Sequence, residues 1–218
     1  MKTELSSKDC VTRARLLETA GRVFAEKGFR GATVRDICRE SGANVAAVNY
    51  HFRDKSGLYS QAIRHWAEIA QQRYPLDETT SPASSPEERL RAFVFAFMQR
   101  LLDEDRPTWH AKLMAREMAD PTPVLDAVVK DFYVPFFKTL CAIIRGILGK
   151  GADEMTVSRC AFSVLGQCLY YHNARHVIAR LLPNSKNARD IELVAGHISD
   201  FSLHALRQVS RGKRKSRK

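Results

Sequence analysis

The sequence predicts an all-α fold in which a small unit of three short helices precedes a larger helical domain, with about nine helices in all. Three observations lead to this prediction. Apolar residues recur at helical spacing along most of the chain, no run of alternating apolar and polar residues indicates a strand, and no internal repeat is visible. The chain has 218 residues, of which 44% are hydrophobic and 27% charged, and this is typical of a folded protein with a core.

The composition argues against a membrane or secreted protein. No apolar run approaches the roughly 18 residues that a membrane-spanning helix requires. The first ten residues, MKTELSSKDC, lack the apolar stretch of a signal peptide. The five cysteines are scattered and never spaced as C-x-x-C, which favours reduced thiols. We therefore expect a cytoplasmic protein that does not insert into a membrane.

The formal net charge of +11 is unevenly distributed. The excess of lysine and arginine falls within residues 1–73 and 206–218, whereas residues 74–205 are close to neutral. Basic residues confined to one segment and one end favour a polyanionic partner. The last eight residues, RGKRKSRK, fit either a nonspecific nucleic-acid arm or a solubilising end, and the sequence does not decide between them.

The first two helices are delimited by capping signals. Residues 11–27 place apolar side chains at helical spacing, and Gly28 follows as a C-cap. Thr33 is a natural N-cap for the second helix, with Asp36 three residues further on as in a capping box. Gly42 ends that helix. The short turn SGA that contains it is what a helix-turn-helix requires between its second and third helices.

The third helix is expected to run from an N-cap at Asn44 to Phe52, with two different faces. Val45, Val48 and Phe52 should pack inward on the first two helices. Small and polar side chains occupy the other face, and such residues allow a helix to enter a major groove about 12 Å wide. Asparagine can bond two edge atoms of a base, and alanine can contact a thymine methyl group. The outward set is Ala46, Ala47, Asn49 and Tyr50.

Helical patterning continues through the larger domain. A loop rich in proline and serine, 75–88, follows the fourth helix, and Pro135 should either kink a long helix or mark a helix start. The expected helices cover 56–74, 87–104, 108–119, 123–151, 154–182 and 188–209.

The segment TRARLLETAGRVFAEKGFRGATVRDICRESGANVAAVNYHFRDKSGLY resembles the N-terminal DNA-binding domain of TetR-type bacterial transcriptional regulators. The matching elements are A-x-x-x-F-A-x-x-G-F-x-x-x-T, I-x-x-x-x-G and Y-x-F-x-x-K-x-x-L-Y, with correct spacing over about fifty residues. Two later segments, REMADPTPVLDAVVKDFYVPFFKTLCAIIRGILG and GQCLYYHNARHVIARLLP, resemble the CecR-like C-terminal domain. The resemblance implies a DNA-binding domain at 1–55, a regulatory and dimerisation domain at 56–210 and a basic tail at 211–218.

The resemblance also implies roles for individual residues. Thr33, Tyr50 and Lys55 match positions that contact DNA phosphates, which position a protein on DNA without reading its sequence. Asn49 stands where the family often has leucine, so it either reads a base or contacts a phosphate. His51 is either a DNA contact or a packing residue, whereas Arg13 and Arg15 are expected to be solvated charges. The predicted DNA-binding set is Thr33, Arg35, Asn44, Val45, Ala46, Ala47, Asn49, Tyr50, His51 and Lys55.

The larger domain should supply a dimer interface and a pocket. Binding to two successive major-groove faces requires a two-fold dimer. We expect the last two long helices to pair with their mates, through a stripe of Cys160, Val164, Cys168 and Tyr171 that intramolecular core would also explain. Aromatic residues gather on the middle helices, where most should be core, and a few polar groups on the same helices suggest a binding site. The predicted ligand-binding set is Trp109, Arg116, Phe136, Gln167, Tyr171 and Arg175.

Together these features predict a ligand-responsive repressor that binds a palindromic operator as a homodimer and is released by a small-molecule effector. An enzyme is disfavoured: His172 and His176 have metal-ligand spacing, but no catalytic motif accompanies them, so no cofactor and no metal are expected. A nonspecific nucleic-acid protein acting through its basic tail is the third reading. The operator sequence, the effector, the target genes and the choice between repression and activation cannot be predicted from the sequence.

Overall fold

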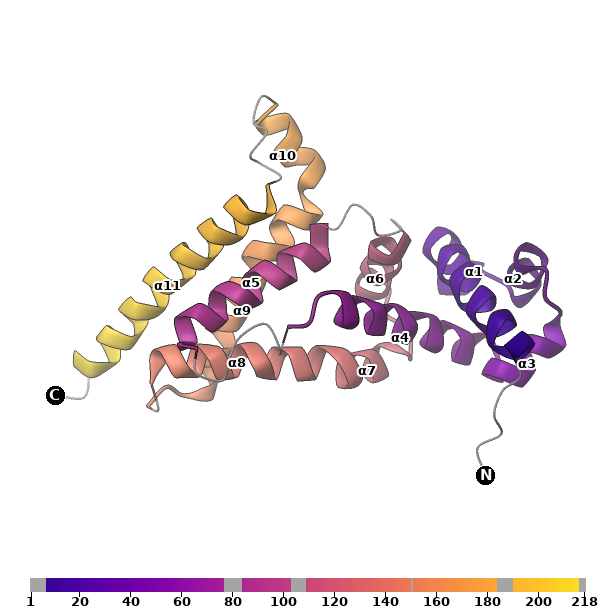
Figure 1. Ribbon diagram of the computed structural model, residues 1–218, viewed down its shortest axis with the longest axis horizontal. Helices are drawn as coiled ribbons and strands as arrows, with labels where there is room; N and C mark the ends of the chain where they lie inside the picture. The colour runs from indigo at the N-terminus through magenta and orange to yellow at the C-terminus, as the bar shows by residue number, and fades with distance from the viewer. Residues whose placement is uncertain (1–6, 77–83, 103–108, 150, 184–189, 216–218) are drawn as a thin grey trace. The chain divides into compact units, whose positions relative to one another are not determined.

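The computed structural model describes residues 7–76, 84–102, 109–149, 151–183 and 190–215, and all regular structure in these residues is helical (Figure 1). The chain forms two compact units. The first draws on Met1–Ile69 and Glu104–Tyr133, and the second on Ala70–Asp103 and Val134–Lys218. The all-α prediction is confirmed. Within the described residues no helix is both long enough and apolar enough to cross a bilayer.

The first unit contains α1 (Ser7–Gly31), α2 (Val34–Ser41), α3 (Val45–Phe52), α4 (Lys55–Arg73) up to Ile69, α6 (Trp109–Ala119), α7 (Leu125–Val128) and a π-helical turn, η1 (Val129–Tyr133). Its core is built around α1. A β-carbon added at Gly21 would lie 2.1 Å from the Trp109 ring, so the glycine allows α6 to pack closely on α1. The Trp109 ring also meets the Trp66 ring edge-on at 4.7 Å. Helix α6 therefore belongs to the same core as the three N-terminal helices.

The second unit contains α5 (Pro86–Leu102), α8 (Val134–Leu148), α9 (Glu154–Asn173), α10 (Arg175–Leu181) and α11 (Ile191–Lys215). Helix α11 packs along α5, α8 and α9 (Figure 1). Helix α5 begins at a capping box, in which Ser85 Oγ accepts from the Glu88 N–H and the Glu88 carboxylate accepts from the Ser85 N–H. Asp153 caps α9 by accepting from the Thr156 N–H at 2.8 Å.

Several predicted helix boundaries differ from the structure. The single helix expected over 123–151 is α7, the η1 turn and α8. Proline has no N–H to donate to the carbonyl four residues back, and the switch from π-helical to α-helical bonding falls next to Pro135. The helix expected over 154–182 is α9 and α10, separated at Ala174. Gly28, with φ of 73°, interrupts α1 where the sequence predicts its end.

The α9 stripe expected at a dimer interface lies in the core of the second unit instead. Val164 and Cys168 are buried, and Cys160 and Tyr171 pack against the same core. Burial also raises the pKa of the Cys168 thiol to about 12. The prediction that this stripe pairs with a second copy is therefore wrong. Apolar residues do remain exposed on the opposite face of α9, which the sequence reading did not single out.

Candidate nucleic-acid interface

The start of α2 is fixed by a cluster around Asp36. Thr33 Oγ1 accepts from the Asp36 N–H at 3.1 Å and donates to the Asp36 carboxylate at 2.9 Å. The Lys27 ammonium and the Arg39 guanidinium lie 3.1 Å and 2.9 Å from the same carboxylate. The bond from Thr33, followed by the one from Lys27, lowers the pKa of Asp36 to about 2. The predicted N-cap is confirmed, and its hydroxyl is held in one orientation at an exposed helix end.

The turn between α2 and α3 has the geometry that its sequence predicts. Gly42 adopts a left-handed conformation (φ 65°, ψ 23°), and its N–H bonds the carbonyl of Cys38. Asn44 then caps α3, since its side-chain oxygen accepts from the Ala47 N–H at 2.8 Å. Helix α3 therefore begins abruptly, and its exposed first turn carries the partial positive charge of a helix N-terminus.

Helix α3 has an inner and an outer face, with two departures from the prediction, at Val45 and at Ala47. Val48 and Phe52 are buried, as expected, whereas Val45 is 44% exposed. The expectation that Val45 packs inward is wrong. Side chains on a helix lean toward its N-terminus, so the side chain of the first residue extends past the helix end rather than onto its neighbours. The half-buried Ala47 packs against the core in its place.

Most of the predicted DNA-binding residues lie on the solvent side of α2 and α3. Tyr50 is 69% exposed, so its side chain does not pack in the core. His51 is half-buried, and its ring lies 4.9 Å from the ring of Tyr50 and 5.8 Å from that of Phe52. The remaining exposed members are Thr33, Arg35, Asn44, Val45, Ala46 and Asn49.

Lys55 lies next to the start of α2. Its ammonium donates to the carbonyl of Ala32 at 3.1 Å and sits 4.6 Å above the centre of the Phe29 ring. Because Ala32 precedes Thr33, this bond brings the first residue of α4 beside the N-cap of α2. The two residues that resemble phosphate contacts are thus neighbours, and Lys55 also has a structural role that sequence reasoning missed.

Sequence reasoning also missed Arg13 and Arg53. Arg13 was expected to be a solvated charge, but it is half-buried, donates to Gln61 of α4 and lies 5.8 Å from the centre of the Phe52 ring. Arg53 ends α3 with φ of 73°, a conformation that favours glycine. No local pattern marks the contacts of Arg13, because its partners are distant in sequence. Arg53 could have been found from its position one residue after the helix, where a C-cap glycine is common.

The predicted ligand-binding residues divide between the two units. In the first unit, Trp109 packs on α1 and Arg116 donates to the carbonyl of Glu26 at 2.9 Å. In the second, Phe136 stacks 5.6 Å from Phe97, and Tyr171 packs on the core. There too, Gln167 donates to the Ser202 hydroxyl at 3.2 Å, and Arg175 bonds the carbonyl of His172. This set stays a prediction.

Among the described residues, His172 and His176 do not belong to a larger group of potential metal ligands. His172 Nδ1 lies 2.8 Å from the carbonyl oxygen of Leu101. Among the residues that the structure describes, no three or more histidine, cysteine, aspartate or glutamate side chains are grouped so that they could hold a metal ion.

Comparison with protein families gives two matches. Residues 16–62 match the family described as bacterial regulatory proteins, tetR family. Residues 86–206, more than half of the chain, match the C-terminal domain of the HTH-type transcriptional dual regulator CecR. The first match covers α2, α3 and the turn between them.

Individual relatives agree with these matches. The dual regulator CecR of Shigella flexneri is 25% identical over 76% of this chain and 78% of its own length. The repressor KstR2 of Mycolicibacterium smegmatis and the probable regulator YttP of Bacillus subtilis are 31% and 30% identical, each match spanning 38% of this chain and 41% of the relative.

Two solved structures share the fold. A tetR-family regulatory protein from Rhodococcus RHA1 superposes with a TM-score of 0.67, at 18% identity, covering 89% of this chain and 96% of that one. A regulator from Saccharomonospora viridis, solved in complex with choline, gives a TM-score of 0.59 at 20% identity, covering 88% and 95%. The chain therefore belongs to the TetR family of bacterial transcriptional regulators, with a CecR-type C-terminal domain, and is a DNA-binding regulator rather than an enzyme.

Proposed function

We propose that this protein is a ligand-responsive repressor that binds a palindromic operator as a two-fold dimer in the bacterial cytoplasm. The observation that carries the proposal is the outer face of α3, which is exposed, uncharged and bounded by caps at both ends. A helix with such a face can enter a major groove, where Asn49 and Ala46 meet base edges. Thr33, Tyr50 and Lys55 then contact the phosphates on either side.

The dimer is supported by apolar side chains that the second unit leaves in solvent. On α9, Phe162 and Tyr170 are 62% and 58% exposed, and on α11, Leu193 and Phe201 are 52% and 61% exposed. Their spacings of eight residues place each pair on one face of its helix. Exposed apolar faces on adjacent helices are typical of an interface between copies of a protein.

Two glycines on the same helices fit this role. A β-carbon added at Gly166 of α9 or at Gly196 of α11 would meet no atom within 4 Å. Neither glycine is therefore needed for packing within the monomer, and each costs roughly 0.5–1 kcal/mol of helix stability relative to alanine. Close approach of a helix from the second copy would explain their presence.

The effector response is supported by a buried bond between α4 and α6. Tyr59 donates to the Glu117 carboxylate at 2.6 Å, and the Thr122 N–H and hydroxyl donate to its other oxygen at 2.9 Å. Glu117 has no solvent exposure, so α6 cannot move without breaking these bonds or carrying α4 with it. An effector that favours a different α6 position would shift α4 and with it the spacing of the two α3 helices.

A small-molecule effector is further suggested by the relative from Saccharomonospora viridis, whose solved structure contains choline. KstR2 is a repressor, and this favours repression. CecR is a dual regulator, so repression and activation have to be distinguished by experiment. A reporter gene placed behind the bound DNA separates these outcomes. Deleting the gene for this protein should raise expression of a repressed target, and a fall in expression would instead assign activation.

The test of DNA binding uses a duplex selected by the protein from a random pool. Replacing Asn49 with alanine should relax the selected sequence at one position if the residue reads a base, and should weaken all duplexes equally if it holds a phosphate. Arg22→Ala, which changes a charge on α1 that is paired with Glu40, is the matched control. If the parent selects no sequence, or Asn49→Ala matches the control, the groove assignment fails.

A further inference from the structure

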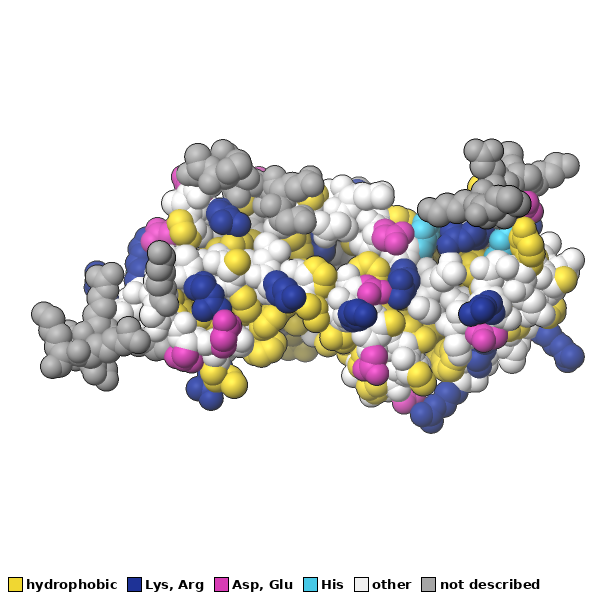
Figure 2. Space-filling view, turned by 90° about the horizontal axis from the view of Figure 1, so that it is seen from below, with side chains coloured by type: hydrophobic (Ala, Val, Ile, Leu, Met, Phe, Trp, Pro, Cys, Tyr) yellow, Lys and Arg dark blue, Asp and Glu magenta, His cyan; other side chains and the backbone are white. Residues whose placement is uncertain are grey.

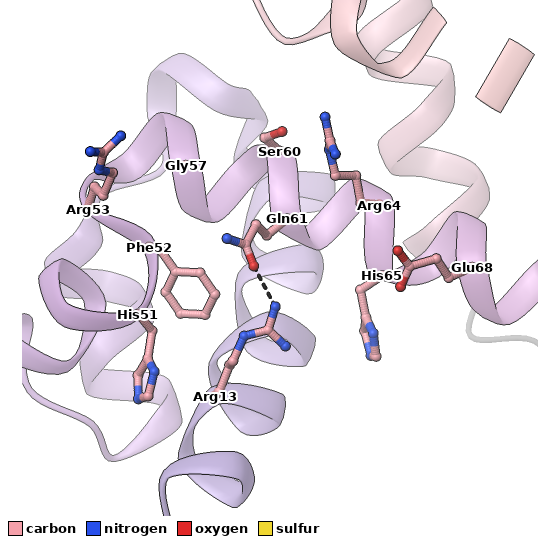
Figure 3. Close-up of a pocket in the computed structure, with 10 residues that line it drawn as sticks. All are labelled: Arg13, His51, Phe52, Arg53, Gly57, Ser60, Gln61, Arg64, His65 and Glu68. Atoms are coloured by element: carbon pink, nitrogen blue, oxygen red, sulfur yellow. Dashed lines mark hydrogen bonds between the residues drawn. The ribbon is translucent and has the colours of Figure 1, made fainter. Parts of the chain in front are cut away.

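A hollow of about 480 Å³ lies within the first unit, between α1, the end of α3 and α4 as far as Glu68 (Figure 3). It is separate from the exposed face of α3 on which the bases would be read. Three guanidinium groups, two imidazoles and one carboxylate line it, together with smaller polar groups. The residues are Arg13, His51, Phe52, Arg53, Gly57, Ser60, Gln61, Arg64, His65 and Glu68.

Arg13 is held in place at this hollow. One of its terminal nitrogens donates to Gln61 Oε1, and its guanidinium carbon lies 5.8 Å from the centre of the Phe52 ring. Figure 3 shows Arg13 between His51 and His65 on one side of α4, with the bond to Gln61 above it. A guanidinium carries five N–H donors, and the Gln61 bond occupies one of them. The group is therefore both positioned and able to bond an anion.

Arg53 stands at the edge of the hollow in a strained conformation. Its φ of 73° and ψ of −54° are unfavourable for a residue with a β-carbon, and it is the only non-glycine residue with positive φ among those described. Glycine would adopt this conformation without strain. The side chain is exposed and makes no contribution to the core, so it does not offset the strain by packing. An exposed arginine at a strained position indicates a role for the charge itself.

The other charged groups of the hollow leave a positive balance. Arg64 is paired with Asp131 of η1, and Glu68 is the one carboxylate in the lining. Burial lowers the pKa of His65, with Glu68 and Glu18 opposing this shift and Arg13 adding to it. In Figure 2, histidine side chains lie beside lysine and arginine side chains toward the right of the view, where Figure 1 draws the first unit. Arg13 and Arg53 thus carry charges that no carboxylate in the lining neutralises individually.

We propose that this hollow binds a phosphate group, with Arg13 as its principal donor and Arg53 as a further cation at its edge. The planar fork of a guanidinium matches two oxygens of a phosphate, and Arg13 lines the hollow together with two imidazoles that can donate N–H bonds to the same anion. The phosphate comes either from the DNA backbone beyond the end of α3 or from a small phosphorylated ligand. The first source rests on the proposed function, whereas the second does not.

The test compares three variants with the parent protein. Arg13→Gln and Arg53→Gly each remove one donor, and Arg15→Gln removes an exposed charge from the same helix as Arg13 without touching the hollow. Inorganic pyrophosphate, without DNA, is added while thermal unfolding and the histidine NMR signals are followed. A free phosphate ligand should raise the midpoint of the parent and of Arg15→Gln and shift the His51 and His65 signals, and should do neither for Arg13→Gln.

The DNA arm measures affinity for the selected duplex against salt concentration. If the hollow holds a backbone phosphate, Arg13→Gln and Arg53→Gly should each reduce the slope of log K against log salt by about one, and Arg15→Gln should not. Arg53→Gly should at the same time raise the melting midpoint, because glycine relieves the strain, so its weaker binding cannot be attributed to unfolding. A parent that binds no duplex contradicts the proposed function and leaves the pyrophosphate arm to decide. Unchanged salt slopes together with no response to pyrophosphate would show that the hollow does not bind phosphate.

Discussion

The outer face of α3 and the outer faces of α9 and α11 differ in the chemistry that they expose. Helix α3 presents Ala46, Asn49 and Tyr50, which are small or polar, whereas α9 and α11 present Phe162 and Phe201. The outer face of α3 carries no charged side chain, which is unusual for a solvated helix, whereas α9 and α11 mix exposed aromatic side chains with charges such as Asp200. A surface of small and polar groups suits a hydrated groove lined with hydrogen-bonding atoms. A surface with aromatic groups suits another apolar surface, and the difference therefore supports the proposal that one unit binds DNA and the other a second copy.

The two surfaces also differ in how they are supported. Helix α3 has eight residues and owes its position to caps and to two buried side chains, Val48 and Phe52. Helices α9 and α11 have 20 and 25 residues and pack on a continuous core. A short helix depends on its ends because its unpaired backbone groups form a large share of its length. Substitutions at the caps should therefore disturb α3 more than comparable changes disturb α9.

The largest expected effect is on the aromatic surface. Phe201→Glu should convert the proposed dimer to a monomer, because a carboxylate would be buried in an apolar contact. Since two linked half-site contacts bind far more tightly than one, affinity for the operator should fall by roughly 10²- to 10⁴-fold. Sedimentation equilibrium and mobility shifts measure the two effects. Met118→Glu changes a residue that is similarly exposed, at 60%, on α6 and should alter neither. If the Phe201→Glu protein is still a dimer, this surface is not the dimer interface.

The next effect separates two tyrosines of the first unit. Tyr59→Phe removes the donor to the buried Glu117 carboxylate, which should cost about 1–3 kcal/mol of stability. For a chain of this size that corresponds to a fall of roughly 2–12 °C in the melting midpoint. Tyr50→Phe, at a side chain that is 69% exposed, should leave the midpoint unchanged and weaken DNA binding instead. Calorimetry and mobility shifts on both variants check this contrast between stability and DNA binding. A destabilised Tyr50→Phe protein would contradict it.

The sequence predicts the local features of the molecule well. Thr33, Gly42 and Asn44 act through backbone bonds to residues only three or four positions away, so their roles can be read from spacing alone. Contacts between distant segments could not be predicted in this way. The Tyr59–Glu117 bond joins residues 58 positions apart, and the Arg13–Gln61 bond joins residues 48 apart.

The sequence also does not predict which face of a longer helix packs on the core. Helix α9 has apolar residues on both sides, and periodicity alone does not say which side meets the core and which meets solvent. Periodicity leaves open whether the stripe of Val164 and Cys168 is interface or core, the family resemblance favours the interface, and the structure places the stripe in the core. Val45 departs from the prediction for a different reason: it is the first residue of its helix, so its side chain leans past the helix end and finds no neighbour to pack on.

A smaller effect comes from glycines with opposite roles. Gly42→Ala forces a β-carbon into a left-handed conformation and should destabilise the protein by about 1–2 kcal/mol, although no neighbouring atom obstructs it. Gly166→Ala lies within α9 in open space and should stabilise an isolated chain by up to about 1 kcal/mol. If α9 meets its mate closely there, the same change should weaken the dimer. Urea unfolding at low protein concentration measures the stability of the isolated chain, and sedimentation measures the strength of the dimer. A tighter Gly166→Ala dimer would place the helix crossing elsewhere.

The smallest effect concerns the support of Thr33 by Asp36. Because folding lowers the pKa of Asp36 from 3.8 to about 2, the carboxylate contributes stability above pH 3.8, and this contribution is lost as the pH falls toward 2. Asp36→Asn should therefore be less stable than the parent at pH 6, with the difference disappearing near pH 2. Asp120→Asn, at an ion pair that is 72% and 84% exposed, should show little difference at any pH. Urea midpoints between pH 2 and 6 check this. If Asp36→Asn also loosens Thr33, its operator affinity should fall slightly at pH 7, and an unchanged affinity would mean that DNA itself orients the Thr33 hydroxyl.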